Sequence, residues 1–94
     1  MRNDILVLGA GAWGTAIANL LAENSNKKIL LWAFEKKVSD SINNKQINTL
    51  FLPKIKLNKN ISSINNFYGI KPVYIFIAVP SQFVYSIVKN YVDS

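Results

Sequence analysis

With 94 residues, of which half are apolar and 17% are charged, the chain fits one small domain and excludes intrinsic disorder as its leading description. Because it contains neither cysteine nor histidine, a disulfide framework, a zinc site and Ser/His or Cys/His catalysis are out of reach of this chain, and we expect no metal. Its net charge of +6 raises nucleic acid as a partner, but the lysines are scattered from Lys27 to Lys89, as on an ordinary solvated surface, so we expect no nucleic-acid partner.

An apolar stretch between residues 5 and 22 resembles a signal peptide or a membrane span at first sight. Three glycines interrupt it, Asp4 stands in what would be its basic flank, and its period changes from a β-type run to a helical pattern. We therefore expect two separate elements and no membrane span. The absence of cysteine is compatible with a cytoplasmic protein, which is the location we expect.

The first predicted element is a strand at residues 5–8, because a short continuous apolar run is typical of a strand buried on both faces of a parallel sheet. A helix follows and ends near Glu23, where Asn24-Ser25-Asn26 predicts a loop. The apolar residues of this helix recur with helical spacing and form one of its faces: Trp13, Ala16, Ile17, Leu20 and Leu21.

A second apolar run predicts a strand at residues 29–32. Val38 and Ile42, four residues apart, then predict a short helix at residues 36–43. Residues 45–60 have no clear period, and Pro53 excludes a long helix there. We expect mostly loop in this region, with a weak strand near residues 60–62.

The strongest strand prediction is the run from Val73 to Val79, which is rich in β-branched and aromatic residues and lies between two prolines. Beyond it, apolar residues again recur with helical spacing, at Val84, Ile87, Val88 and Tyr91. The alternation of strands and helices predicts an α/β fold, in which a parallel sheet carries helices on both faces.

The turn between the first strand and the first helix has G-x-G-x-x-G spacing and reads Gly9-Ala10-Gly11-Ala12-Trp13-Gly14. The spacing alone is a weak signal, and a simple strand-to-helix turn is the alternative, but a buried strand before it and an amphipathic helix after it favour a dinucleotide-binding loop. Gly9 permits the tight turn, Gly11 lets a pyrophosphate approach the backbone, and Gly14 lets the helix pack closely on the neighbouring strand. The N-terminus of the helix would then offer free N–H groups to the anion.

A carboxylate about 20 residues beyond such a loop accepts hydrogen bonds from the adenosine ribose. Glu35 lies 21 residues after Gly14 (35 minus 14), just past the second predicted strand. A carboxylate at this place would repel a 2′-phosphate, which favours NAD over NADP. The alternative is an exposed loop charge next to Lys36 and Lys37.

The run from Gly9 to Ala16 resembles the G-x-G-x-W-G-S/T-A signature of NAD(P)-dependent glycerol-3-phosphate dehydrogenases, in which the tryptophan is the distinctive letter. Three further segments match that family in the same order: Leu31-Trp32-Ala33, Phe51-Leu52-Pro53 and Ile75 to Phe83. Matches spread over nearly the whole chain are far more specific than any one of them.

The resemblance implies that residues 1–94 are the dinucleotide-binding, N-terminal part of such an enzyme, a partial Rossmann fold without the C-terminal helical domain of the family. It implies that residues 9–14 bind the pyrophosphate, that Phe34 packs near the adenine, and that Phe83 packs on the cofactor from the other side. Periodicity alone favours ordinary core packing for both phenylalanines. Many bacterial members have a basic residue at the position of Glu35 and prefer NADPH, so NAD is favoured and NADP stays open.

Members of this family interconvert glycerol 3-phosphate and dihydroxyacetone phosphate in glycerophospholipid precursor synthesis, with catalytic lysines in segments that would follow Ser94. We therefore expect no catalytic residue in this chain, cofactor binding without turnover, and a small phosphorylated substrate only in a complete enzyme. The alternative is a truncated, non-catalytic dinucleotide-binding module, in which an exposed apolar sheet edge would promote self-association.

Overall fold

The computed structural model describes residues 4–94, which form four strands and three α-helices. In chain order the elements are β1 (Ile5–Leu8), α1 (Ala12–Glu23), β2 (Ile29–Trp32), α2 (Lys36–Lys45), β3 (Ile61–Ile64), β4 (Tyr74–Ile77), the 3-10 turn η1 (Ser81–Phe83) and α3 (Val84–Val92). A helix follows each of the first two strands, and β3 and β4 follow one another without a helix between them. The strands β1 and β2 lie where the sequence predicts them. Helix α2 runs two residues past its predicted end, the weakly predicted β3 is a full strand, and β4 is shorter than the run that predicts it.

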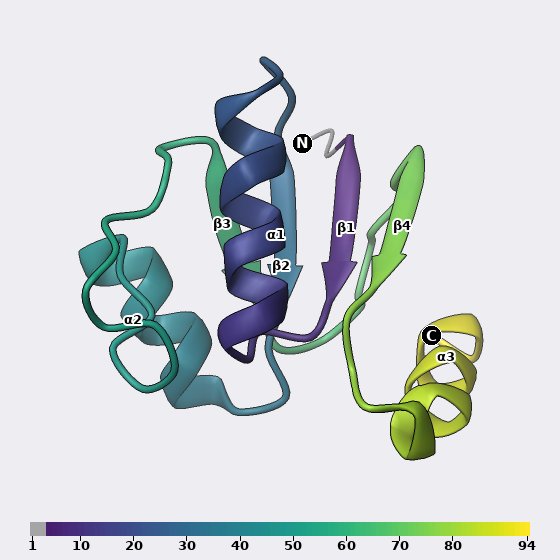
Figure 1. The fold of residues 1–94 in the computed structure, drawn as a ribbon. Coiled ribbons are helices and arrows are strands. Elements are labelled where there is room, and N and C mark those ends of the chain that lie inside the picture. The colour runs from purple at the N-terminus through teal and green to yellow at the C-terminus, as the bar shows by residue number, and fades with distance from the viewer. Residues whose placement is uncertain (1–3) are drawn as a thin grey trace.

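The four strands form one parallel sheet in the order β3-β2-β1-β4 (Figure 1). Strand β1 is central and pairs with β2 from Ile5 opposite Ile29 to Leu8 opposite Trp32. Strand β4 lies on the other side of β1, with Tyr74 opposite Ile5. Every residue of β1 and β2 is buried, as continuous apolar runs require. The parallel α/β fold predicted from the sequence is confirmed.

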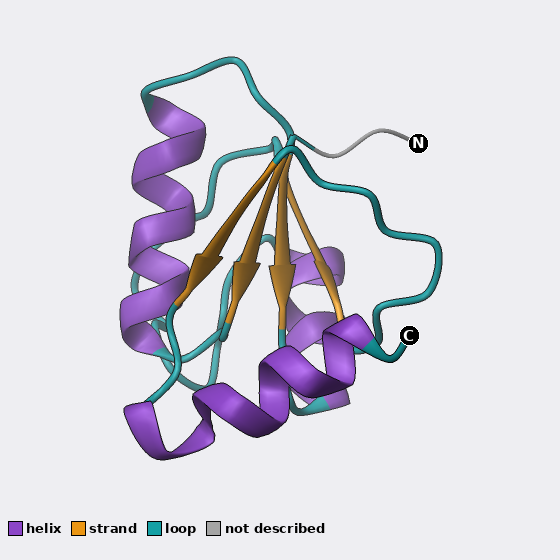
Figure 2. Ribbon diagram, turned by 90° about the vertical axis from the view of Figure 1, so that its right-hand side faces the viewer, coloured by secondary structure: helices purple, strands orange, loops and turns teal. Residues whose placement is uncertain are grey.

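Helices cover both faces of the sheet, as predicted (Figure 2). On one face α1 and α2 enclose a core in which Val7 and Leu31 meet Val38. On the other face α3 lies near the carboxyl ends of the strands, where Ile87 packs with Leu6 and other residues of β1 and β2. The alternation of side chains along a strand therefore divides the apolar runs between two separate cores.

Helix α1 does not bury the apolar face that its sequence pattern singles out. Trp13 is 73% exposed and Leu20 is 59% exposed, whereas the buried positions are small residues: Gly14, Thr15, Ala18 and Ala22. Small side chains let the helix axis approach the sheet closely, which leaves the larger apolar residues beside the contact. Among residues 4–94, no helix combines the length and apolar composition needed to cross a membrane.

A row of aromatic rings connects the end of β2 to α3. Trp32 stacks on Phe67 with ring centroids 5.1 Å apart, and Phe67 meets Tyr91 edge-on at 5.3 Å. Phe34 contacts Trp32 edge-on at 6.2 Å from the other end of the row. Such pairs stabilise by about 0.5–1.5 kcal/mol each beyond the area they bury. The row fixes the loop of residues 65–71 against the second core.

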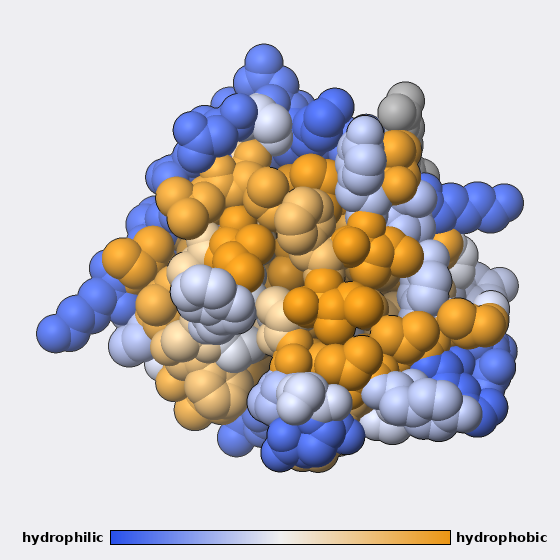
Figure 3. Space-filling view, turned by 45° about the vertical axis from the view of Figure 1, so that its right-hand side comes forward, coloured by the Kyte–Doolittle hydropathy of each residue, from blue (hydrophilic) through white to orange (hydrophobic). Residues whose placement is uncertain are grey.

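Strand β4 is the least covered strand of the sheet. It is the outermost strand on its side, and its four residues are between 42% and 57% exposed. Seen from this side, the surface is largely apolar (Figure 3). The strand with the strongest sequence signal is therefore half exposed, because only β1 flanks it.

Candidate functional site

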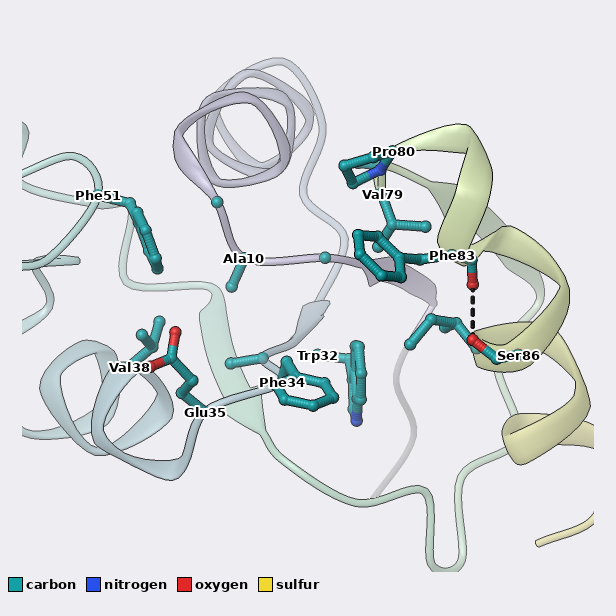
Figure 4. A pocket seen from close by; sticks show the side chains of 15 residues that line it. Ala10, Trp32, Phe34, Glu35, Val38, Phe51, Val79, Pro80, Phe83 and Ser86 are labelled. Carbon is teal, nitrogen blue, oxygen red and sulfur yellow. Dashed lines mark hydrogen bonds between the residues drawn. The ribbon is translucent and has the colours of Figure 1, made fainter.

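The carboxyl ends of the strands open into a cavity of about 340 Å³. Residues 9–11 contribute to its wall directly after β1, Phe34 and Glu35 contribute after β2, and Phe83 of η1 lies across from them (Figure 4). Open parallel sheets bind ligands outside the carboxyl ends of their strands, where the strand order reverses. Here the order reverses between β1 and β4, and the cavity lies at that point. Its volume falls within the range of small-molecule sites, roughly 300–1,000 Å³.

The structure brings together most of the residues that the sequence predicts for the site. Its lining includes Gly9, Ala10, Gly11, Phe34, Glu35 and Phe83. Ala12, Trp13 and Gly14 are not among the lining residues. Trp13 instead extends into solvent from the first turn of α1, and Gly14 faces Gly9 and Ala78.

Gly9 and Gly14 are held against backbone, where no side chain fits. Gly9 has a φ of +121°, and a Cβ atom there would lie 2.5 Å from the carbonyl oxygen of Ala78. A Cβ atom on Gly14 would overlap the carbonyl oxygen of Gly9 and lie 3.2 Å from the Cβ of Ala78. The expected close packing at Gly14 is thus mainly against the glycine turn itself and the end of β4. Gly9 shapes the cavity wall directly, and Gly14 supports the glycine turn from behind it.

Gly11 differs from the other two glycines, because a Cβ atom on it would meet nothing within 4 Å. It is the N-cap of α1, with extended backbone angles, and no side chain caps the helix from this position. The first turn of α1 also contains no acidic residue. The first N–H groups of a helix have no intrahelical partner, and together with the helix dipole they attract anions. The start of α1 is therefore open to an anionic group.

Phe34 and Glu35 form the side of the cavity that follows β2. Phe34 is 77% exposed, so it offers an aromatic surface to a flat ligand instead of filling the core. The carboxylate of Glu35 points from the start of α2 toward the cavity (Figure 4) and lies 3.7 Å from the ammonium of Lys37. The sequence left two interpretations of Glu35 open, a carboxylate of the binding site and a loop charge next to lysines. Its surroundings contain features of both, because Glu35 lines the cavity and also lies beside Lys37.

Several lining residues were not predicted from the sequence. Ala33, Ala78 and Val79 directly follow β2 and β4, and the rule that ligands bind at strand ends could have identified them. Phe51 also lines the cavity, from a loop with no periodicity in its sequence. The only sequence signal for Phe51 is that the segment Phe51-Leu52-Pro53 resembles a segment of the family named in the sequence analysis.

The composition of the wall suits binding better than proton transfer. Most of the lining is apolar or aromatic, Glu35 is its one carboxylate, and no lysine contributes to it. Among residues 4–94, no group of three or more acidic side chains lies close enough together to hold a metal ion. Flat aromatic walls beside an open helix N-terminus fit a ligand that combines a heterocycle with phosphate, as a dinucleotide does.

Comparison with known proteins identifies the family of the chain. A family model described as the N-terminus of NAD-dependent glycerol-3-phosphate dehydrogenase matches residues 4–94. A glycerol-3-phosphate dehydrogenase (NAD(P)+) of Neorickettsia sennetsu is 50% identical over 80 residues, which cover 84% of this chain and 24% of that protein. One of Treponema denticola is 38% identical over 92 residues, covering 96% of this chain and 26% of that protein.

Solved structures agree with these relatives. The glycerol-3-phosphate dehydrogenase of Plasmodium falciparum superposes with a TM-score of 0.82 at 25% identity, over 98% of this chain and 29% of that one. The enzyme of Coxiella burnetii gives a TM-score of 0.77 at 28% identity, over 93% of this chain and 27% of that one. The chain thus spans about a quarter of the length of the curated relatives that it matches.

Proposed function

Because this chain belongs to the family of NAD-dependent glycerol-3-phosphate dehydrogenase N-terminal regions, we propose that its cavity binds a nicotinamide adenine dinucleotide. The cavity would hold the adenosine and pyrophosphate parts of this cofactor. In this proposal the pyrophosphate lies against Gly11 and the start of α1, the adenine packs near Phe34, and Phe83 contacts the cofactor from the other side. The observation that carries the proposal is the open, uncapped start of α1 in the wall of an aromatic cavity.

We further propose that the chain is the cofactor-binding part of a glycerol-3-phosphate dehydrogenase, which interconverts glycerol 3-phosphate and dihydroxyacetone phosphate. The bound cofactor would supply the carbon that gives or takes the hydride. The residues of this chain would bind and orient it, and the groups that act on the phosphorylated substrate would lie outside residues 1–94. A cytoplasmic location is part of the same proposal, in agreement with the absence of cysteine.

Fluorescence titration with NADH tests the binding proposal directly. We expect saturable binding, weaker than that of a complete two-halved dinucleotide fold because only the adenosine side is held. ADP-ribose should therefore compete with NADH, whereas nicotinamide mononucleotide should not. Absence of saturable binding at millimolar NADH, or competition by the mononucleotide alone, would contradict the proposal.

The carboxylate of Glu35 is expected to set the choice between the two cofactors. Replacing Glu35 by glutamine removes a negative charge next to the proposed ribose position, so the affinity for NADPH relative to NADH should rise by about tenfold. Titration of both cofactors measures this ratio. Glu23→Gln is the matched control, because it removes the same charge from the end of α1 and should leave the ratio unchanged. Equal ratios in the two variants would show that Glu35 does not face the ribose.

We also propose that the isolated 94-residue chain associates with itself through β4. Strand β4 has one edge without a strand partner within residues 4–94, and its side chains are apolar and half exposed. Unprotected apolar edges pair readily with a second chain. The exposed Trp13 and Leu20 of α1 add to the apolar surface of the chain.

Sedimentation velocity of two tyrosine variants tests this association. Tyr74→Lys places a charge on β4 and should weaken self-association by about tenfold or more. Tyr68→Lys introduces the same charge in a loop, at a side chain that is 91% exposed, and should leave self-association as in the original chain. A monomeric original chain at 100 µM, on the order of ordinary biochemical concentrations, would rule the proposal out.

A further inference from the structure

Asn48 lies in the loop of residues 46–60 and is completely buried, although the loop around it is largely exposed. Its side-chain amide donates to the carbonyl oxygen of Ala10 at 2.8 Å and to the hydroxyl of Thr15 at 2.9 Å. Its side-chain oxygen accepts a hydrogen bond from the N–H of Phe51 at 3.1 Å. Both amide protons and the amide oxygen of Asn48 are therefore engaged, and each bond reaches a different part of the chain.

These three bonds join two walls of the cavity that are far apart in sequence. Ala10 belongs to the glycine turn, Phe51 belongs to the opposite loop, and both line the cavity. Thr15 lies in the first turns of α1 and is itself fully buried. Asn48 also holds its own loop, because its backbone carbonyl accepts a hydrogen bond from Leu52 at 2.9 Å. Asn48 itself does not line the cavity. It lies behind the wall and connects the lining residues Ala10 and Phe51 from there.

We propose that Asn48 is a positioning residue that sets the conformation of the glycine turn for its ligand, which rests on the proposed binding of a dinucleotide pyrophosphate. The carbonyl of Ala10 and the N–H of Gly11 belong to one planar peptide group, with the two bonds pointing in opposite directions. Fixing the carbonyl of Ala10 therefore fixes the direction of the Gly11 N–H. Gly11 has no side chain whose packing could help to hold this direction, and the place of a Cβ atom on it is open space.

The same side chain sets the distance between the glycine turn and Phe51. Because an amide of fixed length binds both segments, a shift of the glycine turn would break a buried hydrogen bond, and a shift of Phe51 would break a partly buried one. A buried polar group that loses its partner is strongly disfavoured, so the arrangement is held in one state. Asn48 thereby keeps the cavity formed before any ligand enters.

Asn48→Leu tests this role, because leucine has a similar size and makes none of the three bonds. Asn43→Leu is the matched control. Asn43 also makes two side-chain hydrogen bonds between distant segments, to the carbonyl and the N–H of Ser63, both at 2.8 Å, but it joins α2 to β3 and does not line the cavity. We expect the affinity for NADH to fall by about tenfold or more in Asn48→Leu, and to change by less than about threefold in Asn43→Leu.

Amide hydrogen exchange supplies a readout that needs no ligand. In Asn48→Leu the N–H groups of Thr15 and Phe51 should exchange faster than the global change in stability accounts for, whereas in Asn43→Leu they should not. If Asn48→Leu does not fold, Asn48→Ser is measured instead, because its short hydroxyl cannot span the same three partners.

The outcomes separate this inference from the proposed function. If the original chain binds NADH and the Asn48 and Asn43 variants bind it equally well, the positioning role is overturned and the proposed function stands. If the original chain does not bind NADH, the proposed function fails, and local exchange at Thr15 and Phe51 still decides the role of Asn48. Equal exchange in the two variants overturns that role whatever the titrations give.

Discussion

Replacing Gly14 by alanine is expected to lower the free energy of unfolding by roughly 3 kcal/mol or to prevent folding. The added methyl group would overlap the carbonyl oxygen of Gly9, which is backbone and cannot rotate away as a side chain can. Helix α1 cannot move back without losing the contacts of Ala18 and Ala22 with the sheet core. The small residues of α1 let the helix approach the sheet closely, and this close approach leaves no space for a side chain at position 14.

The sign of this effect is informative, because helix propensity alone predicts the opposite. Gly14 lies inside α1, where exchange of glycine for alanine normally stabilises by about 1 kcal/mol. Urea unfolding followed by circular dichroism measures the difference. Gly11→Ala is the control, since its methyl group would enter open space and should change stability by less than about 1 kcal/mol. A Gly14→Ala variant as stable as Gly11→Ala would mean that a methyl group fits between α1 and the carbonyl oxygen of Gly9, and would contradict the close contact.

Replacing Gly11 by valine is expected to lower the affinity for NADH by about 100-fold or more, a loss of roughly 2.8 kcal/mol, while the fold is kept. The backbone of Gly11 has a φ of −71° and a ψ of −174°, which valine adopts readily. Its side chain would occupy the space that the proposed function assigns to the pyrophosphate. Gly11→Val should therefore lose affinity for NADH and keep its stability, whereas Gly14→Ala should lose both.

NADH titration and urea unfolding of the same Gly11→Val sample check this separation. Ala16→Val adds bulk to α1 one turn away, at a half-buried position outside the cavity, and should bind NADH as the original chain does. Undiminished NADH binding by a folded Gly11→Val protein would show that the cofactor does not approach the glycine turn. The binding site would then have to be sought elsewhere on the chain.

The sequence predicts the central part of the fold well because that part follows local rules. The short uninterrupted apolar runs of β1 and β2 are typical of strands covered on both faces, and the structure buries every residue of both. The glycine motif combines spacing with its place between a strand and a helix, and Gly9 does adopt a conformation that favours glycine. Local rules were less informative for α1, because its buried face consists of small residues that an apolar pattern does not reveal.

The part of the cavity contributed by the loop of residues 46–60 was not predictable from local pattern. Asn48 is placed by hydrogen bonds to segments more than thirty residues away in sequence, and Phe51 donates its N–H to Asn48. Such long-range contacts leave no periodic trace in the sequence. A buried asparagine in a lysine-rich loop looks like any exposed asparagine until the chain is folded. Likewise, β4 carries the strongest strand signal, yet the sequence does not show how little covers it.

One of the two tryptophans of the chain is buried and the other is exposed, so their fluorescence reports on two different parts of the molecule. Trp32 is shielded, stacked on Phe67 and part of the cavity wall, so its emission reports on the packing and occupancy of that wall. Trp13 extends into water from the first turn of α1, so soluble quenchers reach it at once. Emission that survives an added quencher therefore originates mainly from the wall, and a single spectrum distinguishes events inside the cavity from events on the helix surface.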